Sequence, residues 1–361
     1  MRALRFYGNK DVRLDFDVPE PTITHAYDVL IAPQWCGICG SDLHEFVGGP
    51  TFCPVHPHPI TGEKLPIVLG HEFSGIVLSV GSDVTNVKPG DNVCVEATLA
   101  CGKCGPCKEG RKNLCVLGPS FYGLSGWGGG MAEKVVIPCD QVHKLPPGLG
   151  LDLGALMEPL SVAWHAIKLS GFEAGKTALV LGSGPIGIAA ILCLQALGAS
   201  ATYVSEPTLA RYKQALDFAA DYVMNPMETD VVAETFRATS GKGVDFSYDC
   251  SGVQATFTTS IKALAPGGTA TNIALWEKPA VYNPMDTLMY EKRLIGSIGY
   301  TWDDFEGVID AVATGKLKNF GSMITARLPL DKCVSGGFEE LINHKDEHIK
   351  IICTPHSELL K

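Results

Sequence analysis

The segment that most constrains the fold is 177–205, TALVLGSGPIGIAAILCLQALGASATYVS, which runs for 29 residues without a charged side chain. A stretch of this length could span a membrane. Its glycines and proline instead divide it into a β-branched run, a helical run that stops at Gly198, and a second β-branched run. This punctuation favours a buried strand, helix and strand, so a membrane is not an expected partner.

Between the first strand and the helix lies GSGPIG, residues 182–187, with the G-x-G-x-x-G spacing. The spacing alone is a weak signal. After a strand and before a helix, however, it is typical of a loop that binds the pyrophosphate of a dinucleotide at the helix N-terminus. A glycine turn that merely permits packing is the alternative. The predicted cofactor-binding residues of this loop are Gly182, Gly184, Pro185, Ile186 and Gly187.

An acidic residue is expected at the end of the next strand, and Glu206 lies there, 19 residues after Gly187. Its carboxylate would accept hydrogen bonds from the adenosine ribose and repel a 2′-phosphate, which favours NAD over NADP. Arg211 lies one helical turn further on. It could cover the adenine, it could be a solvated arginine on the helix face, and it could also ease the binding of NADP.

The chain has 361 residues, which is too long for one ordinary core, so we expect two domains. Up to about Val135, short β-branched runs broken by Gly and Pro (DVLIAP, SGIVLSVG, DNVCVEA, EKVVIP) predict a mainly β domain. Beyond Glu158, alternating strand and helix patterns imply parallel strands with crossover helices. The expected boundaries are 1–157, completed by 299–361, for the first domain and 158–298 for the dinucleotide domain.

Composition narrows the expected partners. The net charge is −10, with 46% hydrophobic and 19% charged residues, which indicates a folded protein without a basic patch for nucleic acid. The N-terminal MRALRFYGNKDVRLDF has frequent charges and no apolar signal-peptide core. We therefore expect a cytoplasmic protein with a small-molecule ligand.

Four of the thirteen cysteines lie within CGKCGPCKEGRKNLC, in a Cys-x2-Cys-x2-Cys-x7-Cys array. Four thiolates on one loop can close a tetrahedral shell around zinc with no open position, so the array predicts a structural zinc site. An iron–sulfur cluster and unliganded reduced thiols are the alternatives. The predicted ligands are Cys101, Cys104, Cys107 and Cys115.

A second cysteine pair lies in WCGICGSDLHE, residues 35–45. By itself, the Cys36 and Cys39 pair could be a redox pair, half of a metal site, or two buried thiols. The motif HPHP, 56–59, could suggest a further metal site, but each His precedes a Pro, which favours an extended loop.

Taken together, CGICGSDLHE, GHE at 70–72, the four-cysteine loop, EPLSVAWHA at 158–166 and GSGPIG resemble, in this order, the zinc-dependent medium-chain alcohol dehydrogenases over nearly the full chain. Within that family the chain is most similar to the sorbitol and butanediol dehydrogenase branch, and SYDCSG, GTATNIA and GSIGY are similar to the fungal (R,R)-2,3-butanediol dehydrogenases. The resemblance implies an α/β fold with a GroES-like mainly-β catalytic domain and a Rossmann doubly wound parallel-sheet domain. It also implies a homo-oligomer and a cofactor contact at Cys250.

Carried over to this sequence, the resemblance implies a catalytic zinc held by Cys39, His71 and Glu158, which Glu72 would join directly or through water. Cys36 then only packs beside the site. The resemblance further assigns three polar residues near the metal. Asp42 would orient the ligand imidazole, Ser41 would bond the substrate oxygen, and His44 would pass the proton to solvent through the NAD ribose.

The expected function is therefore NAD-dependent oxidation of a secondary alcohol, with a vicinal diol or polyol as substrate and 2,3-butanediol and acetoin as the first pair to test. One catalytic and one structural zinc are expected per chain. Three alternatives stay open: a dehydrogenase of a bulkier secondary alcohol, a zinc-free quinone or enoyl reductase on the same fold, and a redox-sensing zinc protein that uses Cys36 and Cys39.

Overall fold

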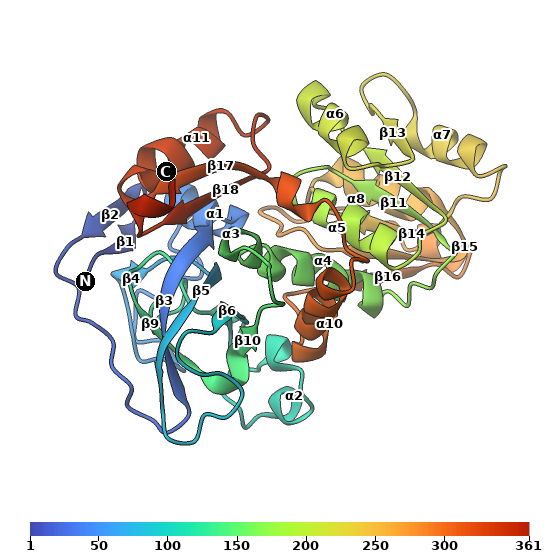
Figure 1. Cartoon of the computed structure of the whole chain (residues 1–361). Coiled ribbons are helices and arrows are strands. Elements are labelled where there is room, and N and C mark those ends of the chain that lie inside the picture. The colour runs from blue at the N-terminus through green and yellow to red at the C-terminus, as the bar shows by residue number, and fades with distance from the viewer. Residues whose placement is uncertain (361) are drawn as a thin grey trace. The chain divides into compact units, whose positions relative to one another are not determined.

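A computed structural model describes residues 1–360, which group into two compact units (Figure 1). The first unit contains Met1–Glu158, Thr301–Ile309 and the chain from Ile324 onward; the second contains Pro159–Tyr300 and Asp310–Met323. The boundaries 1–157 with 299–361, and 158–298, stay a prediction for the domains. This grouping differs from them mainly at 310–323, and Lys361 lies outside the described residues.

The first unit is built around a seven-stranded sheet in the order β10-β6-β5-β3-β18-β17, with β9 paired to β3. Its β-branched runs have the strand propensity that the sequence suggested, and β3, β5, β6 and β9 confirm the four predicted strands. The C-terminal run forms β18, which pairs with β3. The strands are β1 (Ala3–Gly8), β2 (Asp11–Asp15), β3 (Asp28–Gly37), β4 (Ile67–Val68), β5 (Glu72–Val80), β6 (Asn92–Val95), β7 (Thr98–Leu99), β8 (Ser120–Phe121), β9 (Val135–Pro138), β10 (Val142–Lys144), β17 (Ile324–Pro329) and β18 (Lys350–Thr354).

Short helices join these strands. The helices of the first unit are α1 (Gly40–Gly48), α2 (Gly105–Lys108), α3 (Leu151–Gly154) and α11 (Glu339–Asn343). Two longer helices, α4 (Met157–Leu169) and α10 (Trp302–Ala313), begin in the first unit and continue into the second.

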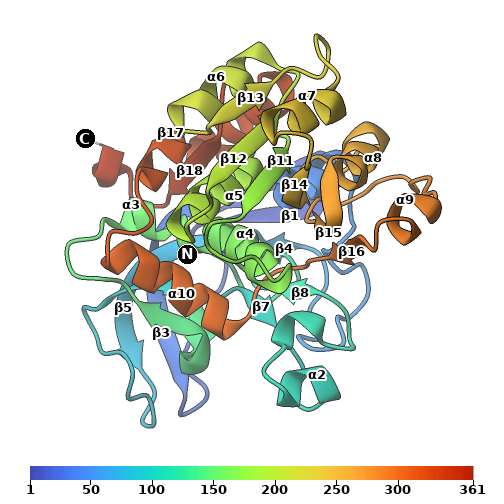
Figure 2. The ribbon, with the colours of Figure 1, turned by 90° about the vertical axis from the view of Figure 1, so that its right-hand side faces the viewer.

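The second unit contains a fully parallel six-stranded sheet in the order β13-β12-β11-β14-β15-β16, which Figure 2 shows in succession. The order reverses beside β11, as it does in a doubly wound dinucleotide-binding fold. The strands are β11 (Thr177–Leu181), β12 (Ala201–Ser205), β13 (Tyr222–Met224), β14 (Val244–Asp249), β15 (Leu264–Asn272) and β16 (Arg293–Gly296).

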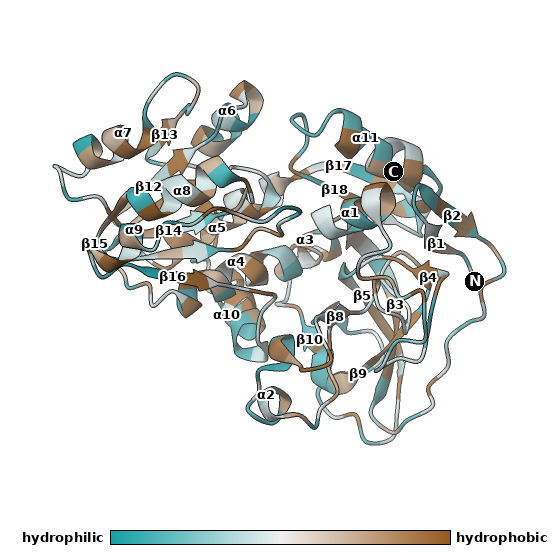
Figure 3. Ribbon diagram, turned by 180° about the vertical axis from the view of Figure 1, so that it is seen from behind, coloured by the Kyte–Doolittle hydropathy of each residue, from teal (hydrophilic) through white to brown (hydrophobic). Residues whose placement is uncertain are grey.

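The uncharged segment 177–205 forms β11, α5 and β12, so the predicted strand, helix and strand are confirmed. Helix α5 is apolar on all sides because it is almost fully buried, whereas α6 and α7 carry both hydrophilic and hydrophobic residues (Figure 3). Among the described residues, no helix has the length and apolarity needed to cross a bilayer. The helices of this unit are α5 (Pro185–Ala196), α6 (Leu209–Asp217), α7 (Val231–Ala238), α8 (Gln254–Lys262) and α9 (Met285–Leu288).

Candidate metal and dinucleotide sites

Cys39 lies at the N-cap of α1, where the chain turns out of β3. The Asp42 carboxylate accepts a hydrogen bond from the Cys39 backbone N–H, at 2.9 Å to Oδ2, in a capping arrangement that fixes the first helical turn. The cap therefore holds the Cys39 thiol and the second oxygen of Asp42 on the same turn.

The buried imidazole of His71 lies against this turn. Its Nε2 is 3.2 Å from Ser41 Oγ, and its Nδ1 is 3.5 Å from Asp42 Oδ1. Burial lowers the pKa of His71, but the Asp42 carboxylate and the Cys39 sulfur raise it by more, so the net shift is upward. The ring therefore presents one nitrogen to Asp42 and the other to the side of Ser41 and Cys39.

The ligand atoms of Cys39, His71 and Glu72 lie within 4.8 Å of one another. A thiolate, an imidazole and a carboxylate are donors that zinc accepts. His71 Nδ1 and Asp42 Oδ1 are both buried, and neither atom has a hydrogen-bond partner within the described part of the chain. Their face-to-face placement is the one that an imidazole bound to zinc through Nε2 would need, so these residues fit the ion.

Glu158, the third ligand implied by the resemblance, is buried near the start of α4. Among the described residues, it is not part of the group whose ligand atoms lie within 4.8 Å. Its charge is one of those that raise the pKa of Lys350, a neighbour of Glu72. The structure thus brings Cys39, His71 and Glu72 together, and the ligation by Glu158 stays a prediction.

Sequence reasoning missed Lys350. Its Nζ lies 2.7 and 2.8 Å from the two carboxylate oxygens of Glu72 and donates to the carbonyl oxygen of Ile38 at 3.1 Å. Lys350 is 2% exposed and Glu72 is fully buried, so the ion pair is shielded from water. One signal in the sequence could have identified it. Lys350 is the single cation inside the apolar run IKIICTP, and a lysine buried in such a run needs a partner.

Two other residues of the WCGICGSDLHE stretch, Cys36 and Glu45, lie in the packed interior. Cys36 is fully buried in β3, and burial raises the pKa of its thiol well above the usual value. Glu45 is buried as well, and its carboxylate accepts the backbone N–H groups of Thr51 and Phe52. A protonated, inaccessible Cys36 argues against the redox pair with Cys39.

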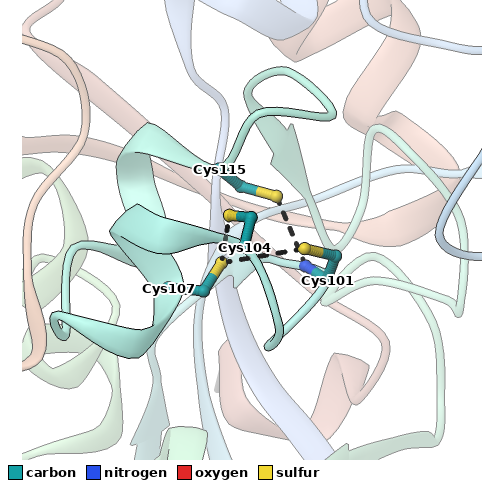
Figure 4. Close-up of side chains that lie close together, drawn as sticks. All are labelled: Cys101, Cys104, Cys107 and Cys115. Atoms are coloured by element: carbon teal, nitrogen blue, oxygen red, sulfur yellow. Dashed lines mark hydrogen bonds between the residues drawn. The ribbon is translucent and has the colours of Figure 1, made fainter.

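The four cysteines of the second cluster point toward one another from one loop and helix α2 (Figure 4). Their sulfur atoms lie within 4.8 Å of one another, and the Cys104–Cys107 sulfur distance is 3.3 Å. A tetrahedral zinc with Zn–S bonds of about 2.3 Å would space the sulfurs about 3.8 Å apart, so the cluster fits the ion.

Backbone amides favour thiolates in this loop. The N–H groups of Lys103 and Cys104 lower the pKa of the Cys101 thiol to about 6. The amides of Val116 and Cys107 lower the pKa of Cys104. Burial, by contrast, raises the pKa of Cys107 to about 12. The loop backbone therefore favours the thiolate form at Cys101 and Cys104, the form in which cysteine binds a metal.

The basic residues of this loop have partners of their own. Arg111 pairs with Glu109, and Lys112 Nζ lies 2.7 Å from Asp140 Oδ2. These two cations are therefore paired with carboxylates, whereas backbone amides contact the sulfur atoms directly.

The HPHP motif forms a loop, as predicted. His58 Nδ1 accepts the backbone N–H groups of Ile60 and Thr61, both at 3.3 Å, and Nε2 lies 3.1 Å from Ser120 Oγ. Burial lowers the pKa of His58. The ring is a neutral loop cap, because both nitrogens are engaged in roles that suit one tautomer.

The GSGPIG loop has the geometry of a dinucleotide turn. Gly182 has φ 91°, and a Cβ there would lie 2.1 Å from Ser251 Oγ. A Cβ on Gly187 would lie 1.9 Å from the carbonyl oxygen of Gly182, so both positions require glycine. Gly184 is the N-cap of α5, with Pro185 at its first position. Gly184, Pro185 and Ile186 remain partly exposed on the outer side of the loop.

Glu206 lies directly after β12 and is bonded to this loop. One carboxylate oxygen accepts the Ser183 N–H at 2.8 Å, and the other accepts the Thr208 N–H at 2.9 Å. Arg211 Nη1 lies 3.6 Å from the position of a Cβ on Gly184. The acid and the base thus flank the same turn, and their contacts with a cofactor stay predictions.

Cys250 follows β14, and its N–H donates to the carbonyl oxygen of Leu181 at 3.0 Å. Burial raises the pKa of its thiol. The residue is therefore at the carboxyl end of the parallel strands beside the glycine loop, the edge at which such sheets bind ligands.

Comparisons with known proteins agree with this architecture. Residues 25–147 match the family described as "Alcohol dehydrogenase GroES-like domain", and residues 185–314 match "Zinc-binding dehydrogenase". These matches confirm the predicted fold class, with one GroES-like and one Rossmann-type part.

Relatives match over the whole chain. The (R,R)-butanediol dehydrogenase of Saccharomyces cerevisiae is 42% identical over 379 residues, covering 99% of each chain. That of Neisseria gonorrhoeae is 41% identical over 359 residues, covering 99% of this chain and 100% of the relative. The crystal structure of 2R,3R-butanediol dehydrogenase from Bacillus subtilis superposes with a TM-score of 0.91 at 38% identity, covering 98% of this chain and 99% of that one. The chain belongs to the zinc-binding alcohol dehydrogenase family and is an oxidoreductase that acts on CH–OH groups.

Proposed function

We propose that the enzyme interconverts a vicinal diol and its hydroxyketone, with 2,3-butanediol and acetoin as the best candidate pair, and that NAD carries the hydride. The names of the relatives in three organisms support the substrate. The observation that carries the proposal is the His71 ring, which is held between Asp42 on one side and Ser41 and Cys39 on the other.

The catalytic zinc would be held by Cys39, His71 and Glu158, with Glu72 as the exchanging or neighbouring carboxylate. A bound zinc supplies Lewis acidity, which lowers the pKa of an oxygen that it contacts. The second zinc would be held by the four-cysteine loop and would have a structural role, because four sulfur donors leave no open position.

The chain's own residues would handle the proton. Asp42 faces Nδ1 of His71 and would accept its proton in a hydrogen bond, which fixes the tautomer that keeps Nε2 free to bind a metal. Ser41 Oγ, beside that nitrogen, would accept the proton of the substrate hydroxyl as it gives up its own toward His44. His44, one helical turn away on α1, would take this proton and release it to solvent.

Cofactor binding would use the glycine loop of the second unit. The partly exposed positions Gly184 and Ile186 have backbone N–H groups at the α5 N-terminus that would donate to a pyrophosphate, whereas Pro185 between them has none. Glu206 would exchange its hydrogen bonds within the loop for the ribose hydroxyls, and its charge opposes a 2′-phosphate. Arg211 and Cys250 would line the same edge.

We also propose that the enzyme is a homo-oligomer. Strand β16 is an edge strand, and the neighbouring segment carries exposed apolar side chains. An edge strand can pair with its own copy in an antiparallel, closed arrangement. Light scattering should report a dimer or tetramer, and Leu288→Glu with Met289→Glu should dissociate it; a monomeric parent enzyme contradicts this proposal. The exposed apolar residues are Val281, Met285, Leu288, Met289 and Tyr290.

The cytoplasm is the location that the cysteines support. None of the thirteen forms a disulfide in the structure. A chain rich in unpaired thiols fits a reducing compartment.

The test of the function is a substrate screen at fixed NAD, with zinc counted per chain. We expect two zincs, and NAD reduction that is fastest with (R,R)-2,3-butanediol and slower with polyols and bulkier secondary alcohols. Faster NAD reduction with a bulky secondary alcohol would change the proposed substrate but not the proposed reaction. One zinc, together with activity on a quinone but on no secondary alcohol, would overturn the proposal.

A further inference from the structure

A second cluster of titratable side chains lies in the first unit and involves none of the residues proposed for catalysis. His143, on β10, is 3% exposed and lies between two carboxylates. Its Nδ1 is in hydrogen-bond contact with Glu306 Oε1, and its Nε2 is 3.8 Å from Glu96 Oε2. Glu96 follows β6, whereas Glu306 belongs to the first half of α10.

Glu96 is the unusual member. It is 1% exposed, and neither of its carboxylate oxygens has a hydrogen-bond partner. The facing Nε2 of His143 has none either. A buried carboxylate without any partner is costly, and a charge of opposite sign nearby is the usual compensation. Among the described residues of this cluster, His143 is the side chain beside Glu96 that can carry a positive charge.

The contacts of the ring point the same way. A neutral imidazole has one N–H and could donate to only one of the two carboxylates, whereas an imidazolium has two. The ring also lies 4.7 Å from the Phe305 ring and 5.7 Å from the Trp302 ring, between centroids, and both residues belong to α10. Aromatic faces attract a cation, so these contacts also favour the charged ring.

We propose that His143 is a protonated clamp, which fastens the first half of α10 to the β10–β6 pair, and that loss of its proton at alkaline pH loosens this helix. Residues 302–306 of α10 supply two aromatic contacts and one carboxylate to the ring. Helix α10 continues from the first unit into the second. The clamp is thus a pH-sensitive attachment within the first unit, and it does not depend on the proposed substrate.

The direction of the pH dependence follows from the neighbours. Burial lowers the pKa of His143, but its hydrogen bond to Glu306 and the charges of Glu306 and Glu96 raise it above its usual value. On β6, the Cys94 thiol is uncharged because burial raises its pKa. The stabilisation is therefore complete below an unfolded-state pKa of about 6.5 and is lost as pH rises through the higher folded-state pKa.

The test uses the full-length enzyme with selectively labelled histidine rings. The NMR signal assigned to His143, identified by its absence in His143→Gln, should be that of an imidazolium at pH 7 and should titrate above pH 6.5. In Glu306→Gln the transition should move to lower pH. His58, a neutral loop histidine, is the matched control and should show no imidazolium at pH 7. A neutral His143 ring at pH 7 overturns the proposal.

Hydrogen exchange measures the clamp itself. After correction for intrinsic rates, amides of 302–309 should open several-fold more often at pH 9 than at pH 6, because loss of the His143 proton removes the charge that both carboxylates contact. The double variant Glu96→Gln with His143→Gln, which removes both buried charges and so keeps the fold testable, should show no such pH dependence. An equal pH dependence in the double variant, or none in the parent, contradicts the proposal.

Discussion

The four-cysteine loop and the Cys39–His71 site each gather metal-binding atoms within 4.8 Å, but they draw them from different distances along the chain. The loop takes all four sulfurs from 101–115, whereas the other site joins the start of α1 to the start of β5. The loop is partly exposed, and its sulfurs are contacted by backbone amides. In the second site His71 and Glu72 are buried and Cys39 is half-buried, and side chains contact its ligands: Ser41, Asp42 and Lys350.

This difference separates what each site can do. Backbone amides come with the loop conformation, so the loop can hold an ion but has no side chain placed to move a proton. The buried site has a hydroxyl, a carboxylate and a lysine around its ligands, each of which can be changed without removing a ligand. The comparison therefore predicts that damage to the loop lowers stability first, and damage to the buried site lowers activity first.

The largest effect is expected from Cys115→Ser in the loop. Zinc-finger peptides gain about 10–16 kcal/mol from a four-ligand zinc, so losing one ligand should lower the free energy of unfolding by roughly 5–10 kcal/mol. Zinc content should fall from two ions per chain toward one, and the melting temperature should fall sharply. Cys139→Ser, a thiol outside the group, should keep both ions. If Cys115→Ser kept both zincs and the parental melting temperature, the loop would not be a metal site.

Cys39→Ser should affect activity most. Without the zinc, the site would no longer stabilise negative charge on the substrate oxygen. This stabilisation is worth several kcal/mol, so turnover should fall by about 10⁴-fold. Zinc should also fall to one per chain, but the melting temperature should fall by much less than in Cys115→Ser. Cys36→Ala, the buried neighbour in the same motif, should keep two zincs and most of the activity. If Cys36→Ala lost zinc and activity while Cys39→Ser kept both, Cys36 would be the metal ligand and Cys39 the packed neighbour.

Lys350→Met tests the ion pair that only the buried site has. The substitution leaves Glu72 buried without its counter-charge, which costs about 3–5 kcal/mol in denaturant unfolding. Lys350→Met with Glu72→Gln should recover most of this loss, because no charge remains buried. Lys112→Met, which removes the exposed pair with Asp140 beside the cysteine loop, should cost less than about 1 kcal/mol. Equal losses in the single and double Lys350 variants would assign the effect to packing.

The same contrast explains what the sequence could predict. Strand and helix patterns and the GSGPIG loop are local, so β11, α5 and β12 were predicted from residues adjacent in the chain, as was the sulfur cluster. The pairing of Glu72 with Lys350 joins residues 278 positions apart, and no local pattern encodes it. The clamp at His143 was missed for the same reason, because Glu96, His143 and Glu306 come from three separate segments.

The ligand set of the buried site depended on the resemblance, since isolated His71 and Glu158 carry no spacing signal. The structure brings His71 to Cys39 and Asp42, but it joins Glu72, not Glu158, to the group within 4.8 Å. Which carboxylate binds the resting ion stays a prediction. Burial and pairing decide it, and these are properties of the folded chain.

His44→Gln should give the smallest effect and the most specific one. A lost proton relay that leaves the metal ligands intact should lower turnover about tenfold at pH 6, less than the about 10²–10⁴-fold typical of direct acid–base groups, because water partly replaces a relay. The loss should shrink as pH rises, since hydroxide can take the proton from Ser41 without a relay. Zinc content and melting temperature should match the parent, which separates this variant from both cysteine variants. A loss of zinc in His44→Gln would mean that the residue supports a ligand, and a pH-independent loss would mean that it positions the substrate; either result would remove the relay from the buried site.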